Sequence, residues 1–361
     1  MTTSLSLVIK KLLVLFLIFA GLYFAEDFLM PLCIGGILAT LFLPFCNLME
    51  RKKVPKSLSV FVCLVSFLLV VFIVISILGF KVSELITDLE IIKLRAIEMG
   101  NTIQKYIFDT LNISISDQFV ILKNEQPSYS NIMQVFLGSV AYVFATTILV
   151  LVYFVFLLYY RNHIKNFLIK ITKRDQQEEM QQVIFSATNI SQQYLIGLSK
   201  MIFLLWIMYG IGFSIIGVEN ALFFAVLCGV LEIVPYVGNI TGTIVTILFA
   251  AFHGGNPTLL IGIVITYGIV QFIQGWILEP LILGPQVKIN PLFTIIVLVL
   301  GELLWGILGV ILAIPLTAIL KIVFDHIEPL KPYGFLIGEI ETPKKEIGLV
   351  EKIKKIIKPK K

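Results

Sequence analysis

The segment Ala221–Phe252, ALFFAVLCGVLEIVPYVGNITGTIVTILFAAF, decides how the rest of the chain is interpreted. It is apolar enough to lie in a lipid bilayer, yet its middle carries Glu232, Pro235, Gly238 and Asn239. A charged side chain at membrane depth is costly, so we expect Glu232 to face protein or a water-filled cavity. Pro235 has no N–H group and clashes with the preceding turn, so a continuous helix should bend or break near it. One helix of this length would run about 48 Å, whereas the hydrocarbon core of a bilayer is about 30 Å thick. The segment is therefore either one long, tilted and kinked span or a re-entrant pair of half-helices.

The composition of the whole chain indicates a membrane protein. The chain is 58% hydrophobic and 14% charged, with a mean hydropathy of +0.97, which lies outside the range of soluble proteins. The alternating pattern of a β-barrel is missing from the sequence. We therefore expect an all-α, polytopic helical membrane protein with about eight membrane segments, of which two, 221–252 and 292–324, are broken or re-entrant.

The charges, cysteines and motifs of the sequence limit which partners, metals and cofactors we expect the chain to bind. The net charge of +5 is concentrated in loops and at the C-terminus, which favours contact with the lipid bilayer over binding of nucleic acid. Cys33, Cys46, Cys63 and Cys228 lie in apolar segments without metal-ligand spacing, so we expect buried thiols, no metal and no cofactor. The motifs HExxH, GxSxG and GxxxxGK[ST] are absent from the sequence, so neither an enzyme nor an ATP-driven pump is expected.

The apolar runs divide the chain into six regions. We expect three transmembrane spans in 1–80, an extracytoplasmic amphipathic helical hairpin in 81–132, a fourth span in 133–160, cytoplasmic interfacial helices in 161–199, a transmembrane core with the two interrupted segments in 200–324, and a basic cytoplasmic tail in 325–361. The loop from Glu50 to Lys56 holds four basic residues in seven positions. By the positive-inside rule this loop and both termini are cytoplasmic.

Glu232 and Glu302 are the ionisable residues that lie away from the ends of the expected spans. Each lies near the middle of an overlong apolar run. The second run is interrupted by Gly301, Gly306, Gly309 and Pro315. Two hydrophobic segments interrupted by Gly or Pro indicate a transporter binding site, because broken helices expose their ends and backbone groups. The alternative is that both runs are kinked structural helices with a satisfied polar residue.

Two glutamines lie on one face of the intervening span. Gln271 and Gln274 are three residues apart, and Tyr267 lies four residues before Gln271, so all three share a helical face. In a membrane such a face contacts another helix or a cavity. The glutamines are either solute-binding groups or hydrogen bonds that hold helices together.

Three blocks of sequence resemble the autoinducer-2 exporter family, the PerM-like permeases. They are LEIVPYVGNITG (Leu231–Gly242), QFIQGWILEPLILGPQVKINP (Gln271–Pro291) and GELLWGILGVILAIPLTAILKIVFDHIEPLKPYG (Gly301–Gly334). The resemblance covers nearly the whole chain. It implies a transporter of the bacterial inner membrane that forms a homo-oligomer. Named members are linked to export of autoinducer-2, and others to sodium/proton antiport.

The resemblance carries the family motif over to eight residues: Glu232, Pro235, Gly238, Pro280, Pro291, Gly306, Gly309 and Pro315. Glu302 departs from the family, since relatives often have a second glycine at this position. Together with the interpretation of the interrupted segments, the motif gives the residues expected to bind substrate or to act as backbone hinges. The expected binding residues are Glu232, Pro235, Gly238, Asn239, Gln271, Gln274 and Glu302. The expected hinges are Gly229, Pro280, Pro291, Gly306, Gly309 and Pro315.

The leading hypothesis is secondary transport, directed outward, of a small polar solute such as autoinducer-2, with proton coupling. Burial favours the neutral form of a carboxyl group, so Glu232 is the candidate carrier of a proton or cation. Pro235, Gly238 and Asn239 would open the backbone, and the two glutamines would bind a hydroxylated solute. A monovalent cation/proton antiporter, with Glu302 as a second carboxylate, is the first alternative. A non-transporting membrane scaffold or passive channel is the second.

Overall fold

The computed structural model describes residues 2–87, 129–234, 237–283 and 288–339, together with five isolated positions between 101 and 109. Within these ranges the chain is helical throughout, apart from turns and one isolated bridge between Ile289 and Gly338. Six of the described helices are long and apolar enough to cross a membrane. They are Glu26–Arg51, Lys56–Gly79, Tyr142–Ile171, Arg174–Ile215, Pro257–Ile282 and Pro291–His326. The predicted fold class, a polytopic helical membrane protein, is confirmed.

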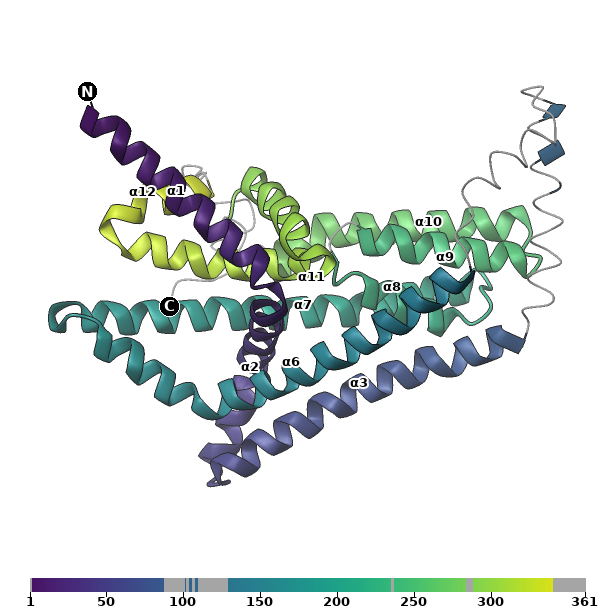
Figure 1. Ribbon diagram of the computed structural model, residues 1–361. Helices are drawn as coiled ribbons and strands as arrows, with labels where there is room; N and C mark the ends of the chain where they lie inside the picture. The colour runs from purple at the N-terminus through teal and green to yellow at the C-terminus, as the bar shows by residue number, and fades with distance from the viewer. Residues whose placement is uncertain are drawn as a thin grey trace, which may run out of the picture.

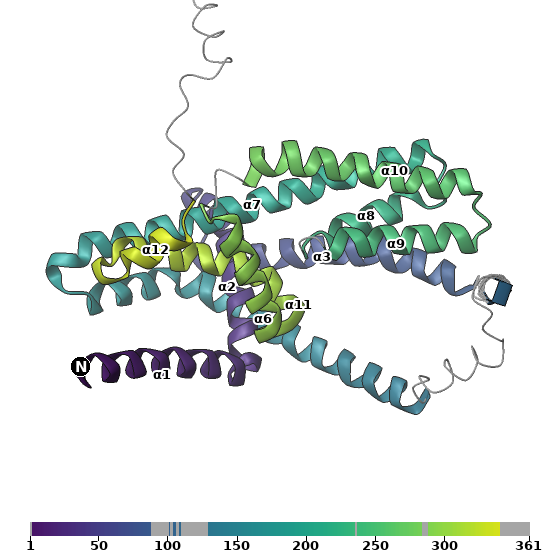
Figure 2. The same cartoon turned by 90° about the horizontal axis from the view of Figure 1, so that it is seen from above.

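The N-terminal part consists of α1 (Thr2–Phe24), α2 (Glu26–Arg51) and α3 (Lys56–Thr87), in the positions of the first three predicted spans. Helix α2 crosses the long helices steeply (Figure 1) and packs against α6 (Tyr129–Ile171). The contact is apolar and includes Ala39, Cys46, Phe154 and Leu158. Helix α1, by contrast, extends away from the other helices (Figure 2) and leaves most of its apolar side chains exposed.

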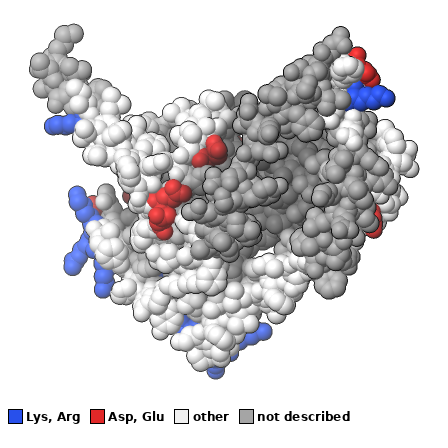
Figure 3. Space-filling model, turned by 45° about the vertical axis from the view of Figure 1, so that its right-hand side comes forward, with Lys and Arg blue, Asp and Glu red and all other residues white. Residues whose placement is uncertain are grey.

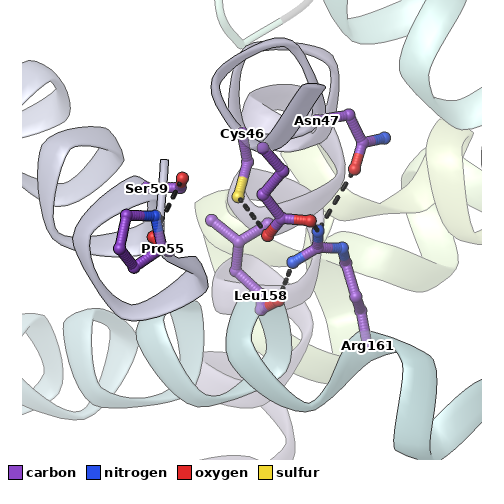
Figure 4. Close-up of polar contacts among 7 residues, drawn as sticks. Cys46, Asn47, Pro55, Ser59, Leu158 and Arg161 are labelled. Atoms are coloured by element: carbon purple, nitrogen blue, oxygen red, sulfur yellow. Dashed lines mark hydrogen bonds and ion pairs between the residues drawn. The ribbon is translucent and has the colours of Figure 1, made fainter. Parts of the chain in front are cut away.

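A polar cluster fastens the ends of α2 and α6 beside this apolar contact (Figure 4). Arg161 Nη2 lies 2.5 Å from Glu50 Oε2 and donates to Asn47 Oδ1 at 3.2 Å. Arg161 Nη1 donates to the Leu158 carbonyl at 2.8 Å, and the Cys46 thiol donates to Glu50 Oε1 at 3.8 Å. Both carboxylate oxygens of Glu50 and both Nη atoms of Arg161 therefore have partners where α6 leaves the apolar region.

Two very long helices meet at one end of the molecule. Helix α6 has 43 residues and α7 (Gln177–Ile215) has 39, and they are joined by η1 (Arg174–Gln176). At 1.5 Å per residue they run about 64 and 58 Å, so both extend beyond a hydrocarbon core of about 30 Å. The predicted interfacial segment 161–199 consists of the end of α6, η1 and the first half of α7, and α7 continues through residue 200 without a break. Most of the hairpin predicted in 81–132, and the tail from 340 onward, lie outside the described residues.

The segment 221–252 forms a helical hairpin and not a single span. Helix α8 (Ala221–Leu231) and helix α9 (Val237–Phe252) run antiparallel. The rings of Phe224 and Phe249 are 4.8 Å apart, and a Cβ added to Gly238 would lie 1.7 Å from the Leu231 carbonyl oxygen. The two helices have 11 and 16 residues, about 16 and 24 Å, so neither could cross the hydrocarbon core alone. The segment is therefore the pair of half-helices of the second alternative and not one kinked span.

The second interrupted segment also folds back on itself. Helix α11 (Pro291–His326) is broken at Trp305 (φ −137°, ψ 21°) and Gly306 (φ 58°, ψ −144°). The positive φ of Gly306 is a backbone conformation that favours glycine. A Cβ added to Gly309 would lie 1.9 Å from the Gly301 carbonyl oxygen. In a straight helix those two residues would be about 12 Å apart along the axis. The two arms of α11 therefore cross closely, and they separate from the turn in Figure 1.

Helix α10 (Pro257–Ile273) lies between the hairpins in sequence and continues into a π-helix, η2 (Gln274–Leu283). After α11, the chain turns through η3 (Glu328–Leu330) into α12 (Lys331–Ile337). Asn290 anchors this end, because its backbone N–H donates to the Ile337 carbonyl at 2.9 Å and its Nδ2 donates to the Leu336 carbonyl at 2.8 Å. The end of the described chain is thereby held beside the start of α11.

The surface agrees with a lipid environment. In Figure 3 the described surface is mostly uncharged, and the Lys and Arg side chains gather at its margins. Large apolar side chains are exposed on most long helices, among them α3, α6, α10 and α11. Such a surface is stable in contact with the acyl chains of lipids and not with water.

Candidate functional site

A cavity of about 500 Å³ lies where the two hairpins approach each other. Its walls come from α7, the turn between α8 and α9, the junction of α10 with η2, and both arms of α11. The polar groups in the wall are Tyr194, Glu232, Asn239, Gln271, Gln274, Glu279, Thr294 and Glu339. The apolar side chains include Leu198, Met201, Ile289, Leu298 and Ile314. A largely apolar cavity of this size with a few converging polar groups is typical of a small-molecule site.

Glu232 occupies the C-terminal end of α8, where the hairpin turns. Its side chain lines the cavity and only 5% of the residue is exposed. Oε1 accepts a hydrogen bond of 2.6 Å from Gln274 Nε2, whereas Oε2 is buried without a hydrogen-bond partner among the described residues. No lysine or arginine contributes to the described cavity wall. A buried carboxylate without a counter-ion costs several kcal/mol, so this position favours binding of a proton or cation.

Gln274 is the centre of the hydrogen-bond network. Its Nε2 also donates to Glu279 Oε1 at 3.4 Å, so one amide group bridges two carboxylates. Its Oε1 accepts from Asn239 Nδ2 at 3.4 Å and from Gln271 Nε2 at 3.3 Å. The side chain is 2% exposed, so these contacts take place in a largely desolvated site. The network joins the first hairpin to α10 and η2, and the predicted common face of the two glutamines is observed.

Glu279 was missed by the sequence reasoning, which paired Glu232 with Glu302. Glu279 is half-buried in η2, five residues after Gln274. In an α-helix, residues five apart point about 140° away from each other. In a π-helix the hydrogen bonds run from i to i+5, which places such residues on nearly the same side. The α-helical period therefore concealed Glu279, and its place inside a family-like block was the one available signal.

The structure does not bring Glu302 into the cavity. This residue is exposed on the first arm of α11 and is not part of the cavity wall. Asn239, Gln271 and Gln274 do line the cavity with Glu232. Gly238 is buried against the Leu231 backbone, where it allows α8 and α9 to touch. Pro235 lies outside the described residues.

The predicted hinge residues have several different roles. The chain turns at Gly306, and Gly309 allows the arms of α11 to cross. Pro291 is the first residue of α11, after the cap Asn290, whose Oδ1 accepts from the Phe293 N–H at 2.9 Å. Gly229 lies inside α8, and a Cβ there would lie 2.1 Å from Trp206 Cδ1, so this glycine provides space for the indole.

Pro280 and Pro315 are the remaining predicted hinge residues. Pro280 lies within the π-helix and lines the cavity together with Pro291. Pro315 is buried in the second arm of α11. Among the described residues, no cluster of three or more His, Cys, Asp or Glu side chains is placed to hold a metal ion.

Comparisons with known proteins place this arrangement in context. The family model described as AI-2E family transporter matches residues 12–328, a range that includes both hairpins and every cavity residue except Glu339. The chain is similar to YueF of Bacillus subtilis, with 27% identity over 84% of this chain and 85% of that protein. It is also 27% identical to a protein of Borreliella burgdorferi, over 91% of this chain and 90% of that protein. Its identity to YhhT of Escherichia coli K12 is 21%, over 92% and 94% of the two chains. All three are named as candidate transport proteins.

Proposed function

Because this chain belongs to the AI-2E transporter family and is a multi-pass membrane protein, we propose that it is a secondary transporter that exports a small polar solute with proton coupling through Glu232. The observation that carries the proposal is the environment of Glu232. A buried carboxyl group lines a cavity, has one free oxygen among the described atoms, and is joined through Gln274 to Glu279.

The cavity chemistry suits a hydroxylated solute of the autoinducer-2 kind. Asn239 and Gln271 offer amide donors and acceptors, and Thr294 offers a hydroxyl group. The volume of about 500 Å³ is in the range of small-molecule sites. The apolar side chains Leu198 and Leu298 cover the rest of the wall and exclude water, which strengthens hydrogen bonds to the solute.

Coupling follows from the cost of a buried charge. When Glu232 is ionised, its carboxylate has one donor and no counter-ion in the described site, so a closed, dry cavity is disfavoured by several kcal/mol. A proton on the carboxyl removes this cost. The cavity would therefore close and reopen to the other side with Glu232 neutral, and opening to water would allow ionisation. Movement of the proton is thereby linked to movement of the solute.

The direction is proposed from the distribution of basic residues. The junction of α6 with α7, which includes Lys173 and Arg174, lies at the same end of the molecule as α12 (Figures 1 and 2). Under the positive-inside rule this end faces the cytoplasm of a bacterial inner membrane. Glu339, next to α12, lines the cavity, so we propose that solute enters the cavity from this side.

Monovalent cation/proton antiport is the second candidate function. The pair of carboxylates, Glu232 and Glu279, bridged by one amide, favours it. Hard monovalent cations bind oxygen ligands, and two carboxylates that compete for one proton or one cation make an exchange site.

The test uses purified protein in proteoliposomes with an imposed pH gradient. Uptake of autoinducer-2 and of sodium is measured in parallel for the wild type, Glu232→Gln and Glu302→Gln. We expect Glu232→Gln to lose pH-driven uptake about tenfold or more, since it cannot exchange a proton. Glu302→Gln, the same change at an exposed carboxylate, should transport as the wild type does. Full activity of Glu232→Gln would remove the carrier role, and uptake of sodium alone would favour the antiporter.

A further inference from the structure

Helix α9 carries a buried polar face that continues beyond the cavity. Asn239, Thr243 and Thr246 are spaced four and three residues apart, so they lie along one side of the helix. Their exposed fractions are 2%, 6% and 0%. Asn239 lines the cavity, whereas the two threonines are not part of its wall. The α9 polar face, as we call these three residues, therefore begins at the cavity and continues along α9 as buried polar groups that do not line it.

Buried oxygen atoms without partners are concentrated at the start of this face. Within the described chain, Glu232 Oε2, Asn239 Oδ1 and Thr243 Oγ1 are all buried and unpaired. Each buried, unpaired polar group costs about 1–3 kcal/mol. Three of them in sequence, from the carboxyl along α9, therefore need an explanation other than stability.

Thr243 differs from several other threonines of the described chain, including its neighbour on the same face. Thr40, Thr147, Thr172, Thr188 and Thr246 each donate their hydroxyl group to the carbonyl four residues earlier. In Thr246 this hydrogen bond to the Gly242 carbonyl is 2.7 Å long. Thr243 makes no such bond among the described residues, so its hydroxyl group is available to a ligand.

The α9 polar face extends from the cavity toward the end of the molecule that lies away from α12. Helix α9 runs from the hairpin turn toward Phe252, at the end of the molecule away from α12 (Figures 1 and 2). Asn239 and Thr246 are about 10 Å apart along the axis, a third of the hydrocarbon core. The α8–α9 contact is tight beside the face, since a Cβ on Gly242 would lie 3.1 Å from Cys228 Cα.

We infer that the α9 polar face is the route by which the proton of Glu232 is exchanged with the side of the membrane opposite the cavity, and that Thr243 positions the water that receives it. The proton leaves Oε2 for water hydrogen-bonded to the Thr243 hydroxyl and moves past Thr246 to bulk solvent, leaving a carboxylate on Glu232. Other titratable groups around Glu232 come from neighbouring elements: Glu279 from η2, Tyr209 from α7, Tyr267 from α10 and Cys228 from α8. The inference rests on the proposed proton coupling.

The first test removes the hydroxyl group and keeps the shape of the side chain. Thr243→Val is compared with Thr243→Ser, which keeps the hydroxyl, and with Thr241→Val, the same change at an exposed position of α9. Proteoliposomes that contain a pH-sensitive dye report net proton flux with autoinducer-2 as the solute. Exchange of autoinducer-2 at equal pH reports solute binding and movement without net proton release.

We expect Thr243→Val to lower net proton-coupled flux about tenfold or more and to leave exchange within about twofold of the wild type. Thr243→Ser and Thr241→Val should keep both activities. Unchanged proton flux in Thr243→Val would overturn the route. Equal loss of flux and exchange would also overturn it, because the residue would then position the solute or the fold. If the wild type itself shows no pH-driven flux, the proposed coupling fails, which is a separate result.

The second test needs no solute. Thr243→Cys is introduced into a chain in which Cys33, Cys46, Cys63 and Cys228 are replaced by alanine. A membrane-impermeant methanethiosulfonate is added from each side. We expect labelling from the side on which α9 ends at Phe252, and none for the control Ile244→Cys, which is half-exposed on the outer surface of α9. Labelling only from the cavity side, or from neither side, would contradict the route.

Discussion

Replacement of Gln274 by leucine tests the contribution of the central amide to transport, separately from the contribution of the rest of the cavity wall. The change removes the donor to Glu232 at 2.6 Å and to Glu279 at 3.4 Å, together with the acceptor for Asn239 and Gln271. Leucine has a similar size, so the helix junction should still pack. The matched control is Gln271→Leu, an identical change one turn earlier on the same face.

The magnitudes follow from the hydrogen-bond lengths. The hydrogen bond of 2.6 Å to Glu232 is short, and when this carboxyl group is ionised the bond is charge-assisted and contributes about 1.5–3 kcal/mol. At about 1.4 kcal/mol per factor of ten, its loss should lower the transport rate about tenfold to hundredfold. Gln271 makes contacts of 3.3 and 3.5 Å, near the limit of hydrogen bonding. Its replacement should cost about 0.5–1 kcal/mol, a change of about two- to fivefold.

The assay is the initial rate of pH-driven uptake in proteoliposomes, with thermal unfolding in detergent as the control for folding. The expected order of rates is wild type, then Gln271→Leu, then Gln274→Leu well below both. Transport by Gln274→Leu within about twofold of the wild type would refute the central role of this amide. Equal losses in both variants, at unchanged melting temperature, would refute the ranking by hydrogen-bond length.

Three further predictions concern the framework of the site, and thermal unfolding in detergent measures each. Gly309→Ala places a Cβ 1.9 Å from the Gly301 carbonyl oxygen and should destabilise the protein by about 3 kcal/mol or more, whereas Gly268→Ala, at a position with open space around it, should be neutral. Equal melting temperatures of the two variants would contradict the crossing of the two arms of α11. Trp305→Phe removes a 3.0 Å hydrogen bond to the carbonyl at the end of α1 and should cost about 1–3 kcal/mol, so an unchanged melting temperature would show that this bond is unimportant. In a double-mutant cycle, Arg161→Met and Glu50→Gln should show a coupling energy of about 1 kcal/mol, because the ion pair is only partly buried. Additive effects of the two substitutions on stability would argue against the ion pair.

Local properties of the chain allowed much of the architecture to be predicted. Hydrophobic length identified the spans represented by α2, α3 and α10, because apolar runs that match the bilayer need no tertiary information. The break near Glu232 followed from the chemistry of proline and glycine, which acts within one turn. The common face of Gln271 and Gln274 followed from helical periodicity. These features depend on residues that are close in sequence.

The long helices show where local patterns end. The sequence predicted interfacial helices in 161–199, separated from the spans, whereas α6 and α7 continue through that region with one short interruption at η1. A charged stretch that continues a helix and one that starts a new helix have the same periodicity. Packing of α7 against α8 and α11 decides between them.

The sequence by itself determined that this protein is helical, lies in a membrane, and carries a carboxyl group beside a disrupted helix. Only the tertiary structure decided that both interrupted segments fold back as hairpins, because the contacts of Leu231 with Gly238 and of Gly301 with Gly309 form across turns. Only the tertiary structure decided that Glu279, and not Glu302, is the carboxylate near Glu232. The physical reason is the same in both cases. Backbone geometry that departs from 3.6 residues per turn changes which side chains meet, and that departure is stabilised by packing between distant parts of the chain.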